Sequence, residues 1–355
     1  MMRRVATRTT LLAAVVATVA LASTAAAGAA RAKPAHSSFT HINFNIYVGN
    51  TTLILPWAAA KFHFFQKNGI SVTFIPTANA PVAISALESG STDFLLSSAD
   101  VMFPFLDKGV EAKLLGGIDR PYLALVARKG SVPTTKYPAS LEALAGKKIG
   151  VSSIGSGAWA FVLDLLGGAN MSSSSVNFVS VGGVITGLAA LESGNVDAVV
   201  LGEPALSAAL RTGNYEVVAD ARHGANVPPV LKQTTSYDAL WTSNSFLSKH
   251  ADIVAKVRRA LAQTQLYMQN PHNFARVRAL YADVAGDSVP TANLTAFVKA
   301  NLPQVSFVYT RQTLNTWINL DYQLGLTKNK LSASAILAPG TPGSIAALEK
   351  LATGK

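Results

Sequence analysis

A segment rich in glycine and serine, in the middle of the chain, has the composition of an anion-binding turn. Residues 152–159 read Ser-Ser-Ile-Gly-Ser-Gly-Ala-Trp and lie between an expected strand and an expected helix. Glycines let several backbone N–H groups point one way, and a helix start adds partial positive charge. Ser153 and Ser156 offer hydroxyl donors, and Gly157 opens the helix. The segment predicts contact with an oxyanion such as a sulfonate, nitrate or carboxylate, although the same residues also suit plain helix capping.

Two further polar segments follow expected strands in the first part of the chain. Asn50 and Thr51 follow the first strand, and Ser98 and Asp100 follow the third. Ligands of open α/β sheets bind at the carboxyl ends of strands, so these four residues are candidate ligand contacts. Asp100 has a second interpretation, because an aspartate at that position also caps a helix.

Three larger side chains complete the candidate site. Glu203 follows the expected strand at 198–201, where its carboxylate either holds an amine of the ligand or pairs with a neighbouring lysine or arginine. Trp159 and Trp241 either stack on a ligand or pack in the core.

The motifs of common catalytic sites are missing from this sequence. Gly155-x-Gly157-x-x-Ala160 resembles a dinucleotide fingerprint, but residues 176–180 lack the acid that would bind the ribose. The six histidines have no metal-binding spacing, and there is no Gly-x-Ser-x-Gly motif. We therefore expect no cofactor, no metal and no enzymatic activity.

Alternating hydrophobic patterns predict the elements that position these residues. In each half, strand, helix, strand, helix and strand follow one another, which is typical of a parallel doubly wound sheet. The expected strands are 41–48, 70–75 and 94–96, then 148–151, 176–179 and 198–201; the helices are 55–67, 80–87, 158–166 and 187–191. A mostly helical tail follows, with helices at 251–269, 274–281, 291–300 and 314–324.

An internal repeat supports two similar lobes. Residues 86–93 read Ala-Leu-Glu-Ser-Gly-Ser-Thr-Asp, and residues 190–197 read Ala-Leu-Glu-Ser-Gly-Asn-Val-Asp. Both copies precede an apolar run, and glycine takes the left-handed conformation after a helix at little cost. We expect a helix, a tight turn and a buried strand in each copy.

The amino-terminal residues have the pattern of a secretory signal peptide over residues 1–32. Arg3, Arg4 and Arg8 precede a short apolar run, and small residues follow. The chain has no cysteine, which excludes disulfides and a lipid-anchored cysteine. We expect a periplasmic protein that is not a lipoprotein. Beyond residue 32 there are 26 basic and 19 acidic residues, a net charge of +7 without dense basic runs, so we expect no nucleic-acid partner.

The remaining residues, about 320, suit two domains. We assign residues 33–127 to the first part of lobe 1, residues 128–235 to lobe 2, and residues 236–355 to a mostly helical second part of lobe 1. Strands at 122–127 and 235–242 would cross between the lobes and form a two-strand hinge.

In this order, the motifs resemble those of one protein family. The Gly-Asn-Thr turn, the repeated Ala-Leu-Glu-Ser-Gly-x-x-Asp, Gly-Ser-Gly-Ala-Trp and Gly-Glu-Pro are similar to substrate-binding proteins of ABC importers with the type II periplasmic fold. The resemblance covers about residues 40–300 and is closest to the branch that binds aliphatic sulfonates, taurine, nitrate and pyrimidine precursors of thiamine.

The resemblance implies a small, anionic organic solute clamped between two lobes, then delivered to an ABC permease with its ATPase, by a protein that we expect to be a monomer. It maps ligand contacts onto Asn50, Thr51, Ser98, Ser153, Ser156, Gly157 and Glu203. Trp159 stands where sulfonate binders often have histidine, which leaves an aromatic or pyrimidine-type ligand as the alternative. A related enzyme relies on cysteines that this chain lacks.

Overall fold

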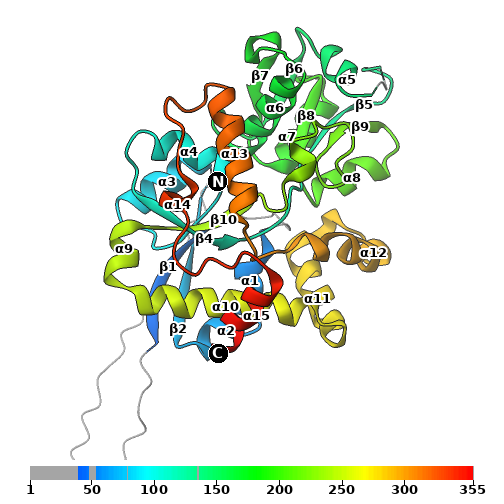
Figure 1. Cartoon of the computed structure of the whole chain (residues 1–355). Helices are drawn as coiled ribbons and strands as arrows, with labels where there is room; N and C mark the ends of the chain where they lie inside the picture. Colours follow the sequence, from blue (N-terminus) through cyan, green and yellow to red (C-terminus); the bar gives the residue numbers. More distant parts are fainter. Residues whose placement is uncertain (1–38, 48–52, 78, 134–135, 355) are drawn as a thin grey trace, which may run out of the picture. The chain divides into compact units, whose positions relative to one another are not determined.

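The structure, a computed structural model, describes residues 39–47, 53–77, 79–133 and 136–354. These residues belong to one compact unit that begins after residue 37. The predicted signal peptide and the candidate residues Asn50 and Thr51 lie outside the described residues. The unit has the expected α/β fold, with one sheet in each of two lobes and helices around both (Figure 1).

The sheet of the first lobe combines two hydrogen-bonded groups of strands. β1 pairs in parallel with β2, and a parallel bridge between Phe44 and Phe94 links β1 to the start of β3. β10 lies antiparallel between β3 and β4. The strands therefore follow the order β2-β1-β3-β10-β4. Their bounds are β1 (Thr40–Ile46), β2 (Ile70–Pro76), β3 (Leu95–Ser98), β4 (Ala112–Gly117) and β10 (Asp238–Ser243).

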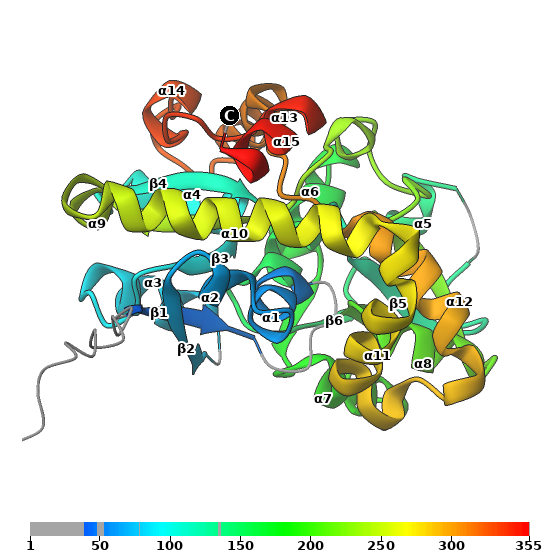
Figure 2. The same ribbon diagram turned by 90° about the horizontal axis from the view of Figure 1, so that it is seen from below.

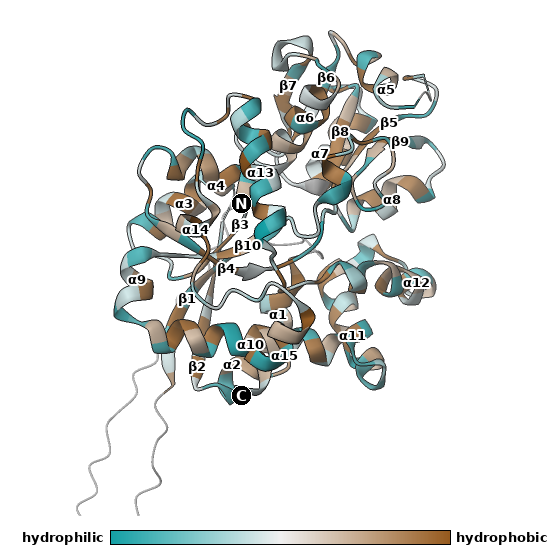
Figure 3. Cartoon of the chain, in the orientation of Figure 1, coloured by the Kyte–Doolittle hydropathy of each residue, from teal (hydrophilic) through white to brown (hydrophobic). Residues whose placement is uncertain are grey.

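The sheet of the second lobe repeats this arrangement with the order β7-β6-β8-β5-β9. β6 is parallel to β7 and β8, whereas β5 is antiparallel to β8 and β9. Figure 3 shows that hydrophobic residues concentrate on these strands. The bounds are β5 (Ala124–Arg128), β6 (Lys148–Val151), β7 (Asn177–Ser180), β8 (Ala198–Leu201) and β9 (Tyr215–Asp220).

The three strands expected in each half are parallel to one another, as predicted, whereas β5 and β10, which follow the crossings, are antiparallel to their neighbours. The chain enters the second lobe at Leu123, beside the end at which β6 and β8 finish, so β5 must run in the opposite direction. β10 likewise begins at Asp238, opposite Ser98, the last residue of β3. Residues 118–123 and 234–237 make the crossings. The domain boundaries that we assign at residues 127 and 235 stay a prediction.

The two crossings are hydrogen-bonded to each other. Ile118 N donates to Asp238 O at 2.8 Å, and Tyr237 N donates to Asp119 O at 3.0 Å. The buried Asp119 side chain also accepts a bond from Asp238 N at 3.0 Å. These hydrogen bonds hold the two crossings side by side between the two sheets.

The internal repeat has the same structure and the same hydrogen bonds in both lobes. Asp93 Oδ2 accepts a hydrogen bond from Asn43 N at 2.7 Å, and Asp197 Oδ2 accepts one from Lys148 N at 2.8 Å. Gly90 and Gly194 both have a left-handed φ, near +76°. Each repeated aspartate therefore joins the turn before the third strand to the first strand of its own lobe, at Asn43 in the middle of β1 and at Lys148, the first residue of β6.

The helix expected at 55–67 is interrupted. α1 (Ile54–Lys61) ends at Phe62, and α2 (Phe64–Lys67) starts after His63, whose φ is +63°. No glycine or proline marks this break in the sequence. The other helices of the two lobes are α3 (Ala80–Glu88), α4 (Ala99–Leu106), α5 (Ala139–Glu142), α6 (Gly157–Gly168), α7 (Val184–Glu192) and α8 (Ala205–Arg211).

The carboxyl-terminal tail is mostly helical, as expected. α10 is the longest helix and runs along α1 and α2, with α15 packed against it (Figure 2). The helices of this tail are α9 (Asn244–Lys249), α10 (Ala251–Gln269), α11 (Phe274–Ala285), α12 (Thr291–Asn301), α13 (Arg311–Gln323), α14 (Ala333–Ile336) and α15 (Ile345–Thr353). Among the described residues, none of the helices has the length and apolarity that crossing a membrane requires.

Candidate ligand-binding site

A cavity of about 210 Å³ lies where the two lobes and the two crossings meet. Its polar wall residues come from both lobes and include Asn79, Ser98, Ser152, Ser156, Tyr47 and Asp238. Its apolar wall residues include Leu53, Val101, Leu123, Val181 and Val200. A cleft that combines apolar walls with a few convergent polar groups is the usual form of a small-molecule site.

The amino-terminal ends of four helices converge on this cavity. Asn79 precedes α3, Ser98 precedes α4, Ser156 precedes α6 and Gly183 precedes α7, and all four residues line the cavity. The first N–H groups of a helix have no partner within that helix, and they carry partial positive charge. The cavity therefore favours an anion even though none of its described wall residues is a lysine, an arginine or a histidine.

Ser156 serves its own helix as well as the cavity wall. Its Oγ accepts a hydrogen bond from Trp159 N at 3.3 Å and donates to Ser153 O at 2.6 Å. The capping interpretation is thus correct for this hydroxyl, and its proton is already used. Ser153 Oγ is buried without a hydrogen-bond partner among the described residues, and its side chain is not part of the cavity wall.

Gly157 allows the two lobes to approach each other closely. A Cβ atom at this position would lie 3.0 Å from Tyr237 Oη and 3.4 Å from Ser98 Oγ. Tyr237 Oη also donates to Gly157 O at 2.9 Å. The structure therefore brings together two predicted site residues, Ser98 and Gly157, with a tyrosine that the prediction did not include.

Asp100 is buried beside this contact and is not part of the cavity wall. Its Oδ1 accepts a hydrogen bond from Val101 N at 2.7 Å, and its Oδ2 lies 3.3 Å from Tyr237 Oη. Burial raises the pKa of Asp100 to about 6, although hydrogen bonds with Ser98, Val101 and Tyr237 act in the opposite direction. Asp100 therefore contacts Tyr237, a residue of the cavity wall, and does not itself line the cavity.

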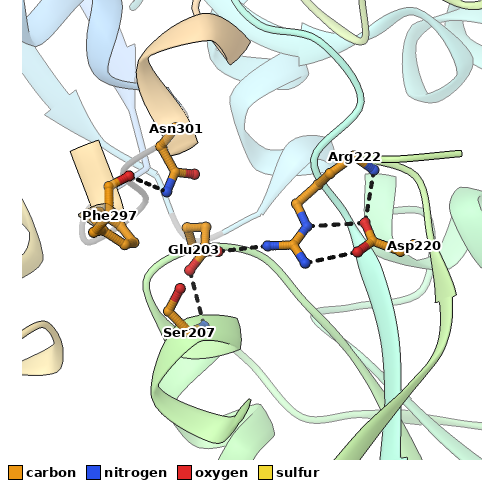
Figure 4. Close-up of polar contacts among 6 residues, drawn as sticks. All are labelled: Glu203, Ser207, Asp220, Arg222, Phe297 and Asn301. Atoms are coloured by element: carbon orange, nitrogen blue, oxygen red, sulfur yellow. Dashed lines mark hydrogen bonds and ion pairs between the residues drawn. The ribbon is translucent and has the colours of Figure 1, made fainter. Parts of the chain in front are cut away.

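Of the two uses considered for Glu203, the structure shows the internal ion pair. Its Oε1 lies 2.8 Å from Arg222 Nη1, and its Oε2 accepts a bond from Ser207 N at 3.0 Å. Arg222 also forms an ion pair with Asp220, on β9 (Figure 4). The neighbouring Gly202 lines the cavity, whereas Glu203 does not.

The two predicted tryptophans lie in packed regions and not in the cavity wall. Trp241 is fully buried, and its Nε1 donates to Ser97 O at 2.9 Å. Trp159 packs edge-on against Phe178, with ring centroids 6.2 Å apart. Core packing, the other role considered for each of them, describes both.

Several wall residues were missed in the sequence. Gly183 was detectable, because the repeat spacing of 104 residues maps Asn79 onto it, and both precede a helix. Tyr237 and Asp238 lie within the crossing expected at 235–242, where Trp241 is the one predicted site residue. Tyr47 and Tyr122 have no motif that sets them apart, since tyrosines at strand ends are common.

Comparisons with known proteins extend over most of the chain. The family model described as NMT1/THI5 like matches residues 50–273. The alkanesulfonate-binding protein SsuA from Xanthomonas axonopodis pv. citri, bound to MOPS, is a solved structure with 18% identity and a TM-score of 0.66, covering 83% of this chain and 97% of its own. The periplasmic nitrate-binding protein NrtA from Synechocystis PCC 6803 has 12% identity and a TM-score of 0.68, covering 89% of each chain.

A third solved structure is a cysteine-to-serine mutant of DszB in complex with biphenyl-2-sulfinic acid, with 16% identity and a TM-score of 0.59, covering 89% of this chain and 99% of that one. No curated protein matches the sequence. These structural likenesses show the fold, and the family model spans more than half of the chain. This protein therefore belongs to the NMT1/THI5-like family and has the fold of periplasmic binding proteins.

Proposed function

We propose that this protein is an extracytoplasmic solute-binding protein that captures a small anionic organic solute between its two lobes and delivers it to an ABC permease. The observation that carries the proposal is the convergence of four helix amino termini on one cavity between the lobes. Helix amino termini bind oxyanions through backbone N–H groups, so no cationic side chain is required.

The composition of the wall favours an organic anion of the sulfonate class over a purely inorganic one such as nitrate. Leu53 and Val101 come from the first lobe, and Val181 and Val200 come from the second. These side chains would contact an apolar body while the helix ends hold the anionic head. An aromatic or pyrimidine-type ligand is the alternative on the same walls.

We propose binding without catalysis. Two of the solved structures described above are of binding proteins, and the third has a serine in place of a cysteine. This chain has no cysteine, and the described wall of the cavity holds a single carboxylate, that of Asp238. An enzyme on this scaffold would need an acid and a base that face each other across the cavity.

The remaining assignments belong to the same proposal. A binding protein of an importer works outside the cytoplasmic membrane, as the expected signal peptide also indicates. Its partners would be the permease and the ATPase of one importer, and it would act as a monomer.

The proposal is tested by thermal unfolding of the purified protein with a panel of solutes. The panel contains alkyl and aryl sulfonates, taurine, nitrate, aromatic carboxylates and hydroxymethylpyrimidine, with sodium chloride at equal ionic strength as the control. A ligand at 100 times its dissociation constant adds about 2.7 kcal/mol to the free energy of unfolding. We expect a rise in Tm with one organic anion class. No shift with any anion, together with no small molecule released on denaturation, would contradict the proposal.

A further inference from the structure

Among the described residues of the cavity wall, one carries a carboxylate, although the helix amino termini around the cavity attract anions. Asp238 begins β10 and lines the cavity, and it is 7% exposed. Its Oδ2 atom is buried and has no hydrogen-bond partner among the residues that the structure describes. An acceptor of this kind, left without a donor, is costly in a folded protein and calls for an explanation.

The groups around Asp238 are acids and phenols. Asp119 accepts a bond from the backbone N of Asp238, and the hydroxyl of Tyr122 hydrogen-bonds its carboxyl group. Asp100, Tyr47, Tyr237 and Tyr309 are the other titratable groups that interact with it electrostatically. None of these groups is a cation that could neutralise the carboxylate.

Burial, followed by the charge of Asp100, raises the pKa of Asp238 to about 7, while hydrogen bonds with Tyr122 and Asp119 act in the opposite direction. Near neutral pH the group is therefore close to the balance between its two forms. The ionised form accepts hydrogen bonds from Tyr122 and Asp119 but leaves Oδ2 without a donor among the described residues, whereas the neutral form supplies its own proton. A ligand with an N–H group would satisfy the ionised form directly.

We propose that Asp238 is a specificity-determining ligand contact, and that the solute carries an ammonium or other N–H donor in addition to its anionic head. This inference rests on the proposed function and names the substrate class of the same site. The anionic head lies toward the helix amino termini, and the donor lies toward Asp238 and the neighbouring Tyr47. The hydroxyl of Tyr47 is also buried without a hydrogen-bond partner among the described residues.

The test uses three pairs of probes that differ only in the amino group: taurine and ethanesulfonate, sulfanilate and benzenesulfonate, and β-alanine and propionate. Isothermal titration at pH 8 measures the dissociation constant of each for the purified protein. We expect the amino member of at least one pair to bind at least tenfold more tightly, since a hydrogen bond to a charged group has that effect. In Asp238→Asn, the preference should fall to less than threefold.

The pH profile provides a second measurement that does not depend on a variant. Binding of the member without nitrogen should strengthen as the pH falls from 8 to 6, because Asp238 loses its negative charge. Asp164→Asn is the matched control: Asp164 is a fully buried acid of α6, outside the described cavity wall. This control should keep the preference of the natural protein for the amino group.

The outcomes separate the two proposals. If members without nitrogen bind as tightly as the amino members and their affinity does not change between pH 8 and pH 6, the role of Asp238 is overturned while the solute-binding function stands. The same holds if Asp238→Asn folds and keeps the full preference. If no member of any pair binds, the role of Asp238 is overturned, and the thermal-unfolding panel with the search for released small molecules then decides whether the solute-binding function stands.

Discussion

Tyr237 Oη lies 2.9 Å from the carbonyl oxygen of Gly157, so a residue of the second crossing is hydrogen-bonded to the first turn of α6. The same Oη lies 3.3 Å from Oδ2 of Asp100, on α4. One hydroxyl has one proton, so both contacts are satisfied together when Asp100 is protonated and donates to Tyr237. This arrangement connects the hinge, the first lobe and the amino end of the second-lobe helix.

Replacing Tyr237 by phenylalanine should weaken this connection. Tyr237→Phe leaves a buried carboxyl and a carbonyl oxygen without their partner, which costs about 1–3 kcal/mol in the free energy of unfolding. Urea unfolding measures the loss, and titration with the solute measures weaker binding. Tyr322→Phe is the control, because Tyr322 is 46% exposed on α13. Equal stability of the two variants would show that the Tyr237 hydrogen bonds contribute nothing.

Gly157→Ala should lower the affinity for the solute. The new methyl group would lie 3.0 Å from Tyr237 Oη and 3.4 Å from Ser98 Oγ, so one wall residue must shift. The matched control is Gly343→Ala, since a Cβ at Gly343 meets no atom within 4 Å. Isothermal titration compares the three proteins. Unchanged affinity in Gly157→Ala would argue against the close approach of the lobes at this point.

Glu203→Gln should reduce stability without changing which solute binds. Glu203 is buried, and removing one charge of a buried ion pair costs about 3–5 kcal/mol when the other charge stays buried. Arg222 keeps its second partner, Asp220, so we expect the lower end of this range. Asp283→Asn, in the exposed pair with Lys61, should leave Tm nearly unchanged. A shift in solute preference in Glu203→Gln would instead indicate direct contact with the ligand.

Three buried acids should make the protein less stable as the pH rises. Asp100 on α4, Asp164 on α6 and Asp321 on α13 lie close enough to interact electrostatically, and both carboxylate oxygens of Asp164 and of Asp321 have no partner among the described residues. Burial raises the pKa of all three; the charge of Asp100 adds to the effect on Asp164 and Asp321, and the charge of Asp321 adds to that on Asp164.

The folded protein therefore holds more protons than the unfolded chain. For Asp100, whose pKa is about 6 against 3.8, the stabilisation is complete below pH 4 and is lost as the pH rises through 6. The change is about 3 kcal/mol, at 1.36 kcal/mol for each pKa unit. Urea unfolding between pH 4 and pH 8 should show this decline, and Asp321→Asn should make it less steep. A free energy of unfolding that rises over this range would contradict the assignment.

Much of the framework was predictable, because local patterns encode it. The repeated Asp93 and Asp197 were visible as a pair, and both make the same hydrogen bond to the first strand of their lobe. The Gly-Ser-Gly turn correctly located the start of α6 at the cavity. The end of a strand and the start of a helix are set by residues that are close together in the sequence. These boundaries can therefore be predicted from one sequence.

The rest depends on contacts between distant segments. Arg222 reaches Glu203 because β8 and β9 lie on either side of β5 and both end opposite Ala124, and no spacing rule pairs these residues. Asp238 faces the cavity because the chain re-enters the first lobe there and β10 runs antiparallel to β3. The sequence does not indicate the direction of β10 in the sheet. The residue type of Trp241 suggests a ligand contact, but its position in the middle of β10 places it in the core.

The proposed function requires that the cavity recognise the negative charge of an organic anion. Isothermal titration with benzenesulfonate and with its neutral isostere methyl phenyl sulfone tests this most directly, since the two differ chiefly in charge. We expect one-to-one binding of the sulfonate and binding of the sulfone that is at least tenfold weaker. Equal affinity for the two compounds would contradict it.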